Sequence, residues 1–242
     1  MNEMTDGHIV SSYNKDLNHL HQLVIEIKDL ACKQVREAIQ SLEDEDVVAA
    51  QHVIVSDREI DALDIRADEE ILRLIAKRQP MARDLREIMT IAKIVGDLER
   101  IGDQARRLAR LTIRFYEGDA PPPNHQLLQD LIRMAAFVND MVGDAVMAFD
   151  ELDLDRALDV IRRDGVVSDD FRSALRRLST FIMEDARSVG HMVDVVLGLR
   201  GLERIGGHAK NISRYVVFLV KGKDVRHKDL EAVEAEIAAS LR

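Results

Sequence analysis

Carboxylate side chains recur at helical spacing in two neighbouring segments of the chain. Glu99 and Asp103 are four residues apart, so on a helix they share one face. Like charges at that spacing cost a helix roughly 0.2–0.5 kcal/mol per pair. Clustered carboxylates from two adjacent helices are hard oxygen ligands for a divalent or trivalent cation. The second segment places four aspartates on one narrow helix face: Asp57, Asp61, Asp64 and Asp68.

A solvated acidic surface explains the same pattern without a metal. Arg106 and Arg107 follow Asp103 by three and four residues, which suits ordinary ion pairs along a helix. Other site chemistry finds no support, because no Glu has a His three residues later and no nucleotide-binding glycine motif occurs. The sequence therefore favours a protein that is not an enzyme, with metal binding and a plain acidic face as the two readings of the carboxylates.

The acidic positions belong to a unit that occurs twice. The five residues Leu-Glu-Arg-Ile-Gly stand at 98–102 and again at 202–206. The likeness continues, since Ala209 matches Ala105 and Lys210 matches Arg106. The copies differ at the next position, where Gly207 stands in place of Asp103. The chain is therefore expected to be an internal duplication whose second copy is poorer in carboxylates.

The elements that must position these residues are long helices. Apolar residues at steps of three and four predict helices over 13–42, 47–77 and 81–117 in the first copy, and over 127–149, 153–186 and 191–220 in the second. A short amphipathic helix is expected at 228–241. Such helices cannot bury their apolar stripes alone, so each trio should pack as an antiparallel bundle. The predicted fold is all-α, with two tandem three-helix bundles.

Three consecutive prolines near the midpoint, at 121–123, cannot lie inside a helix. They predict a linker at 119–125 between a first bundle over 1–118 and a second over 126–242, which includes the short C-terminal helix. The chain is 46% hydrophobic but only 4% aromatic, with few glycines and prolines, as helix bundles are. Its formal net charge of −10 argues against nucleic acid as a partner.

Location in the cell is suggested by what the sequence lacks. Cys32 is the single cysteine, so the chain forms no internal disulfide, and a small core residue is the expected role for it. The polar first nine residues do not resemble a secretory signal, and the apolar run at 215–220 is too short to span a bilayer. The expected location is the cytoplasm.

Two longer motifs carry a resemblance to a known family. They are Asp-Leu-Glu-Arg-Ile-Gly-Asp at 97–103, preceded by Gln-Pro-Met-Ala-Arg-Asp-Leu-Arg at 79–86, and Leu-Glu-Arg-Ile-Gly-Gly-His-Ala-Lys-Asn-Ile at 202–212. Over almost the whole chain the sequence resembles the PhoU family of phosphate-signalling proteins. The resemblance implies metal clusters held by Glu/Asp-x-x-x-Asp pairs. Here these pairs are Asp57 with Asp61 and Glu99 with Asp103, and Asp64 is a further candidate ligand.

The resemblance also implies a regulatory role. Members of the family restrain phosphate uptake and the phosphate-starvation response by linking the ATPase subunit of the phosphate transporter to a membrane sensor histidine kinase. A homodimer in the cytoplasm is expected, with membrane contact only through those partner proteins. The metal would be iron, zinc or manganese, since carboxylate ligands alone do not select one.

The second copy departs from the family pattern. Asp164 matches Asp57, but Ser168 stands where Asp61 has its counterpart, and Gly207 replaces the usual aspartate. A second site would have to use Asp164, Glu203 and His208, or it would be weak or empty. A surface or packing role is the simpler expectation for His208. Two other functions remain open, a carboxylate-bridged metalloenzyme and a purely structural helical interaction module.

Overall fold

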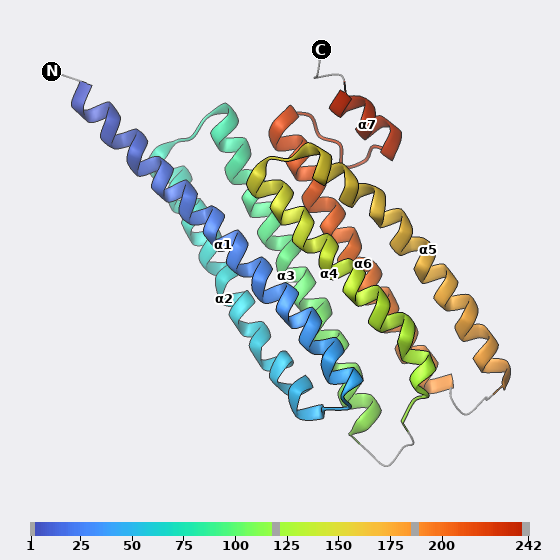
Figure 1. The fold of residues 1–242 in the computed structure, drawn as a ribbon. Coiled ribbons are helices and arrows are strands. Elements are labelled where there is room, and N and C mark those ends of the chain that lie inside the picture. The colour runs from blue at the N-terminus through green and yellow to red at the C-terminus, as the bar shows by residue number, and fades with distance from the viewer. Residues whose placement is uncertain (1–2, 118–121, 185–188, 239–242) are drawn as a thin grey trace.

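The computed structural model describes residues 3–117, 122–184 and 189–238, with side chains described for all of these except 3–13 and 181–184. Within these ranges the chain forms helices and contains no strand, so the all-α prediction is confirmed. The helices are α1 (Glu3–Glu43), α2 (Val47–Arg78), α3 (Ala82–Tyr116), α4 (His125–Glu151), α5 (Leu154–Glu184), α6 (Val189–Lys221) and α7 (Leu230–Ala238) (Figure 1).

The helix boundaries differ from the sequence prediction mainly at the ends of the chain. Helix α1 begins at Glu3 rather than at residue 13, although Gly7, Ser11 and Ser12 are weak helix formers. Helix α7 begins at Leu230, next to an Asp229 carboxylate that accepts a hydrogen bond from the Ala232 backbone N–H at 2.9 Å. The predicted ends at 186 and 241, and part of the predicted linker, lie outside the described residues.

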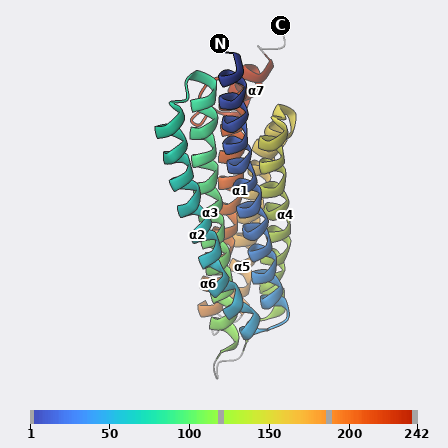
Figure 2. The same ribbon diagram turned by 90° about the vertical axis from the view of Figure 1, so that its left-hand side faces the viewer.

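The helices pack as two antiparallel three-helix bundles, as predicted. Helices α1 to α3 form the first bundle and α4 to α6 the second. The two bundles join along their length, because α3 packs against α6 and α1 packs against α4. Helix α2 therefore covers one edge of the molecule and α5 the opposite edge, while the other four long helices form its middle (Figures 1 and 2).

One apolar core runs through both bundles. Nearly all buried apolar residues of α1, α3, α4 and α6 belong to a single packed cluster, to which α2 and α5 each add one face. A smaller cluster joins Val217 of α6 to α5 and α7. A glycine makes room for tight packing where the two bundles meet. A Cβ added at Gly198 of α6 would lie 2.7 Å from Leu111 Cδ1 of α3 and 2.9 Å from Leu131 Cδ2 of α4. No larger residue fits there unless these leucines move.

Side-chain caps fix the turns that align the helices. Asp46 accepts a hydrogen bond from Ala49 N at 2.9 Å at the start of α2. Gln79 ends the same helix with a left-handed backbone, and Pro80 follows it. These turns set the register between α1, α2 and α3, and so decide which carboxylates meet.

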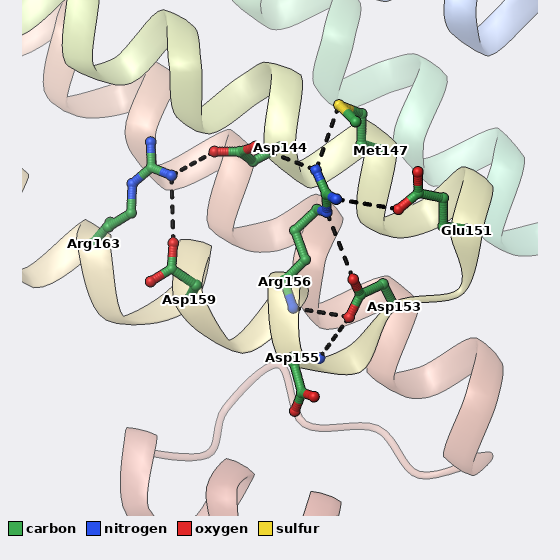
Figure 3. Close-up of polar contacts among 8 residues, drawn as sticks. All are labelled: Asp144, Met147, Glu151, Asp153, Asp155, Arg156, Asp159 and Arg163. Atoms are coloured by element: carbon green, nitrogen blue, oxygen red, sulfur yellow. Dashed lines mark hydrogen bonds and ion pairs between the residues drawn. The ribbon is translucent and has the colours of Figure 1, made fainter.

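The corner between α4 and α5 is held by a denser polar network (Figure 3). Asp153 accepts hydrogen bonds from the backbone N–H groups of Arg156 and Asp155, at 3.0 and 2.9 Å, which lowers the pKa of its carboxyl. The Arg156 side chain reaches back to Glu151, at 3.2 Å. Further along α5, Arg163 joins Asp144 to Asp159, at 2.5 and 3.4 Å. The α4–α5 corner of the second bundle thus adds ion pairs to its cap, whereas the α1–α2 corner of the first bundle has the Asp46 cap and a hydrogen bond from Gln40 to Asp44.

Candidate metal centre

Asp57 lies on the face of α2 that packs against the core. Its neighbours on that face are Val53 and Ile60, and Asp57 itself is 2% exposed. Gly102 of α3 faces it across the seam between the two helices. A Cβ at Gly102 would lie 2.8 Å from Ile60 Cδ1 and 3.2 Å from Asp57 Oδ1. The glycine of the repeated motif therefore makes room for a buried carboxylate on the adjacent helix.

Arg106 connects this buried carboxylate to the acidic face of α3. One of its terminal nitrogens, Nη1, donates to Asp57 Oδ2, and the other, Nη2, donates to Asp103 Oδ1, each at 2.5 Å. Burial raises the pKa of Asp57, and the Arg106 guanidinium opposes part of that rise. Two of the predicted metal ligands, Asp57 and Asp103, are thus paired with Arg106 in this structure. The interpretation of the carboxylates as an ordinary acidic surface predicted such an ion pair for Asp103.

The outer carboxylates of the same seam have no such partner. Within the described part of the chain, Asp61, Asp64 and Glu99 form no ion pair and no hydrogen bond through their side chains. Burial raises the pKa of Glu99, and the negative charges of Asp103, Asp64 and Asp61 raise it further. Burial also raises the pKa of Asp64, with a further contribution from the neighbouring Asp68. The structure therefore brings Asp61, Asp64, Glu99 and Asp103 into one electrostatic cluster.

The donors of the first bundle fit a hard cation by their chemistry. They are oxygen ligands of one charge sign, partly buried, and short of basic partners. They do not form a ready-made cage, because among the described residues no three His, Cys, Asp or Glu side chains gather closely enough to hold one metal ion. A cation would have to draw the flexible carboxylates of Asp61, Asp64, Glu99 and Asp103 together.

Two predicted ligands of the second bundle, Asp164 and Glu203, are each paired with a basic residue. Lys210 of α6 donates to Asp164 of α5, the position that matches the Arg106–Asp57 pair of the first bundle. Glu203 pairs instead with Arg200, one helical turn before it on α6. Each of the two carboxylates therefore has its own basic partner, and Gly207 offers no carboxylate at the position that matches Asp103.

His208 lies at a different place again, in the seam between α3 and α6. Its Nδ1 is 2.7 Å from Oδ1 of Asp97, a residue that is 1% exposed. Burial raises the pKa of the nearby Tyr215 to about 12, and Asp97 adds to that rise. Sequence reasoning gave no role to Asp97 or Tyr215. The available signal was the register of Asp97, which falls among the buried Ile94, Leu98 and Ile101 of α3.

The helices themselves give no sign of membrane insertion. Across the described ranges, none of them combines the length and the apolar composition needed to cross a lipid bilayer.

Comparison with known proteins agrees with the repeat, the fold and the motif. A model of the PhoU domain matches residues 24–112 and again residues 131–216. The phosphate-specific transport system accessory protein PhoU homolog of Pseudomonas putida is 40% identical over 97% of this chain and 91% of its own length. The accessory protein PhoU of Escherichia coli K12 is 32% identical over 91% of this chain and 90% of its own length.

Solved structures show the same architecture. The crystal structure of PhoU from Pseudomonas aeruginosa superposes with a TM-score of 0.80 at 39% identity, covering 87% of this chain and all of that one. The fold extends to the phosphate transport system regulatory protein PhoU from Streptococcus pneumoniae, with a TM-score of 0.78 at 22% identity over 88% of this chain and 99% of that one. The chain belongs to the PhoU family.

Proposed function

We propose that this protein is a regulatory adaptor that restrains phosphate uptake and the phosphate-starvation response. The observation that carries the proposal is the match of both halves to the PhoU domain, together with near full-length similarity to accessory proteins of phosphate-specific transport systems. The described side chains support a role without catalysis, since the candidate centre contains carboxylates and one arginine but no nucleophile paired with a base.

The proposed partners are the ATPase subunit of the phosphate transporter and the sensor histidine kinase of the phosphate response. The adaptor would act in the cytoplasm as a homodimer, and it would touch the membrane only through these proteins. Its net charge of −10 supports protein partners over nucleic acid.

Metal binding at the α2–α3 seam is the second part of the proposal. Asp61, Asp64, Glu99 and Asp103 would hold an iron, zinc or manganese ion, with Asp57 and Arg106 beneath them. A bound cation would supply positive charge where burial and neighbouring carboxylates raise the pKa of Glu99 and Asp64, and it would tie α2 to α3. The second bundle would hold no ion of comparable affinity.

Deletion of the gene in its host tests the regulatory role. We expect phosphate uptake and starvation-gene expression to rise in phosphate-rich medium, and the intact gene to restore both. Unchanged uptake and expression in the deletion strain would show that the protein does not restrain this response.

Metal analysis of purified protein tests the proposed ion separately. Protein purified without chelators should contain a transition metal, and Asp103→Ala should lose most of it. Glu203→Ala, at the position in the second copy that matches Glu99, serves as the matched control and should keep the wild-type content. Equal losses in both variants would refute the asymmetry, and metal-free wild type would leave only a structural role for the acidic face.

A further inference from the structure

A basic groove lies on the seam between α3 and α6, between the C-terminal part of α3 and the N-terminal part of α6. It is separate from the acidic α2–α3 seam, and its volume is about 280 Å³. Such a groove is unexpected on a chain with a net charge of −10. Five arginines line it: Arg107, Arg110, Arg114, Arg200 and Arg204.

Three of these five arginines form no ion pair within the described part of the chain. Arg114 pairs with Asp194, and Arg200 pairs with Glu203. Arg107, Arg110 and Arg204 form no ion pair or hydrogen bond with any part of the chain that the structure describes. Exposed like charges held along one groove repel one another, so an acidic ligand would relieve a cost that the free protein carries.

The floor of the groove is apolar, with one polar exception. Leu108 and Leu111 of α3 and the 58% exposed Leu197 of α6 supply apolar surface. Gln104 also lines the groove. It is only 6% exposed, and its side-chain amide has no hydrogen-bond partner among the described residues. The oxygen and nitrogen of this amide are not among the fully buried unpaired atoms of the described residues, so they remain open to water and can form hydrogen bonds with a ligand.

The distribution of the arginines along the groove favours a polypeptide ligand over a small anion. Arg107 and Arg114 are separated by about 10 Å along α3, at 1.5 Å per residue. One phosphate group is too small to pair with arginines along the whole groove, whereas successive acidic side chains can do so. Nucleic acid fits poorly, since none of the lining residues is aromatic and the overall negative charge repels a polyanion.

We infer that the α3–α6 groove binds an acidic, amphipathic segment of a partner protein. Carboxylates of that segment would pair with Arg107, Arg110 and Arg204, and an apolar side chain would pack on Leu197. The inference goes beyond the proposed function, because it assigns a binding surface that neither the metal nor the restraint of phosphate uptake requires.

Fluorescence anisotropy with a labelled synthetic peptide tests the inference on the full chain. The probe is a peptide of about 15 residues built from Glu and Leu at helical spacing, and a second peptide carries Gln in place of every Glu. The acidic peptide should bind and the Gln peptide should bind at least about tenfold more weakly. Equal binding of both peptides would overturn the inference.

Reversing the charge of arginines in the groove tests whether the peptide binds there. Arg107→Glu combined with Arg204→Glu should weaken the acidic peptide about tenfold or more. The matched control is Arg58→Glu combined with Arg83→Glu, two exposed arginines outside the groove that change the net charge by the same amount. The control should stay within about twofold of wild type. Equal weakening in both double variants would show that overall charge alone governs binding and would overturn the assignment.

Two further measurements separate the peptide from other ligands. Leu197→Ala should weaken the peptide about fivefold, because its exposed side chain supplies apolar contact. Unchanged peptide affinity in Leu197→Ala would contradict an amphipathic partner.

Inorganic phosphate should displace the peptide no better than sodium chloride of equal ionic strength. Specific displacement by phosphate, or tighter binding of a single-stranded RNA that the same charge reversal abolishes, would also overturn the inference.

Discussion

Gly102 is the residue on which the α2–α3 seam depends most directly, since Ile60 and Asp57 occupy the space that a side chain would fill. Gly102→Ala should destabilise the fold by about 1–3 kcal/mol, because the added methyl group would push into both residues. Gly96→Ala in the same helix is the control. A Cβ there meets nothing within 4 Å, so alanine should stabilise the helix by about 0.5–1 kcal/mol.

Urea unfolding followed by far-UV circular dichroism measures both changes. A shift of the midpoint in the same direction for the two variants would mean that helix propensity, rather than close packing, governs Gly102.

Glu99 gives a prediction about pH for the protein in chelator. Its raised pKa comes from burial and from Asp103, Asp64 and Asp61, with Arg100 in partial opposition. The folded form therefore holds the proton more tightly than the unfolded chain, and the ionised group opposes folding above the folded pKa. Glu99→Gln should raise the Tm by about 1–3 °C at about pH 7. The gain should vanish near about pH 3.5, below the pKa of roughly 4.3 in an unfolded chain.

Differential scanning calorimetry at the two pH values checks this prediction. Glu203→Gln is the matched control from the second copy, where the carboxylate is already paired with Arg200. Its Tm should not rise at either pH. A gain for Glu99→Gln that persists at the lower pH would show that the carboxylate charge is not its cause.

At the scale of elements, each outer helix is tied to its neighbour by a cross-helix ion pair at matching positions. Asp57 and Arg106 join α2 to α3, and Asp164 and Lys210 join α5 to α6. The two pairs differ in burial, since the aspartate side chain is 3% exposed in the first and 17% exposed in the second. The cost of removing the cation should therefore differ between the bundles.

Arg106→Met should cost about 3 kcal/mol at about pH 7, because it leaves the Asp57 charge buried without a partner. Without Arg106 the pKa of Asp57 rises further, so the penalty should shrink as pH falls through that folded pKa. Lys210→Met should cost about 1 kcal/mol or less. Urea unfolding at two pH values measures these costs. Equal costs in the two variants would contradict the difference in burial.

Apolar periodicity was sufficient to predict the elements. The stripe at Ile91, Ile94, Leu98 and Ile101 repeats every three or four residues, and these residues are buried in α3. The ends of α1 and α7 were less predictable, because residues near the chain ends lack that strong pattern and helix propensity is weak evidence.

The partners within the candidate site were only partly predictable. Spacing along one helix placed Glu99 and Asp103 on a shared face, and it named Arg106 as a neighbour of Asp103. It did not reveal that Arg106 also reaches Asp57, because that contact depends on how α2 is rotated against α3. The same reason hid the contact between Asp97 and His208, which belong to different bundles.

At the scale of the whole molecule, the two bundles share one core and should unfold together. Leu131 of α4 is fully buried and lies where α4 meets the Gly198 region of α6, next to Leu111 of the first bundle. Leu131→Ala should lower stability by about 2–5 kcal/mol while keeping one thermal transition. Differential scanning calorimetry measures this directly. Two separated transitions, with only one of them shifted, would show that the bundles are independent domains.

The seam between α3 and α6 also discriminates between the pairing of unlike halves and the pairing of like halves. The repeat aligns Asp97 with Gly201 and Gln104 with His208, yet the seam sets Asp97 against His208 and Gln104 against Gly201, where a Cβ would lie 3.4 Å from Gln104 Oε1. Two copies of α3 packed in this way would leave each Asp97 facing an amide instead of an imidazole. Two copies of α6 would leave each His208 facing a glycine. The first half is thus fitted to the second half rather than to a copy of itself, which disfavours assemblies in which two first bundles or two second bundles pack together through this seam.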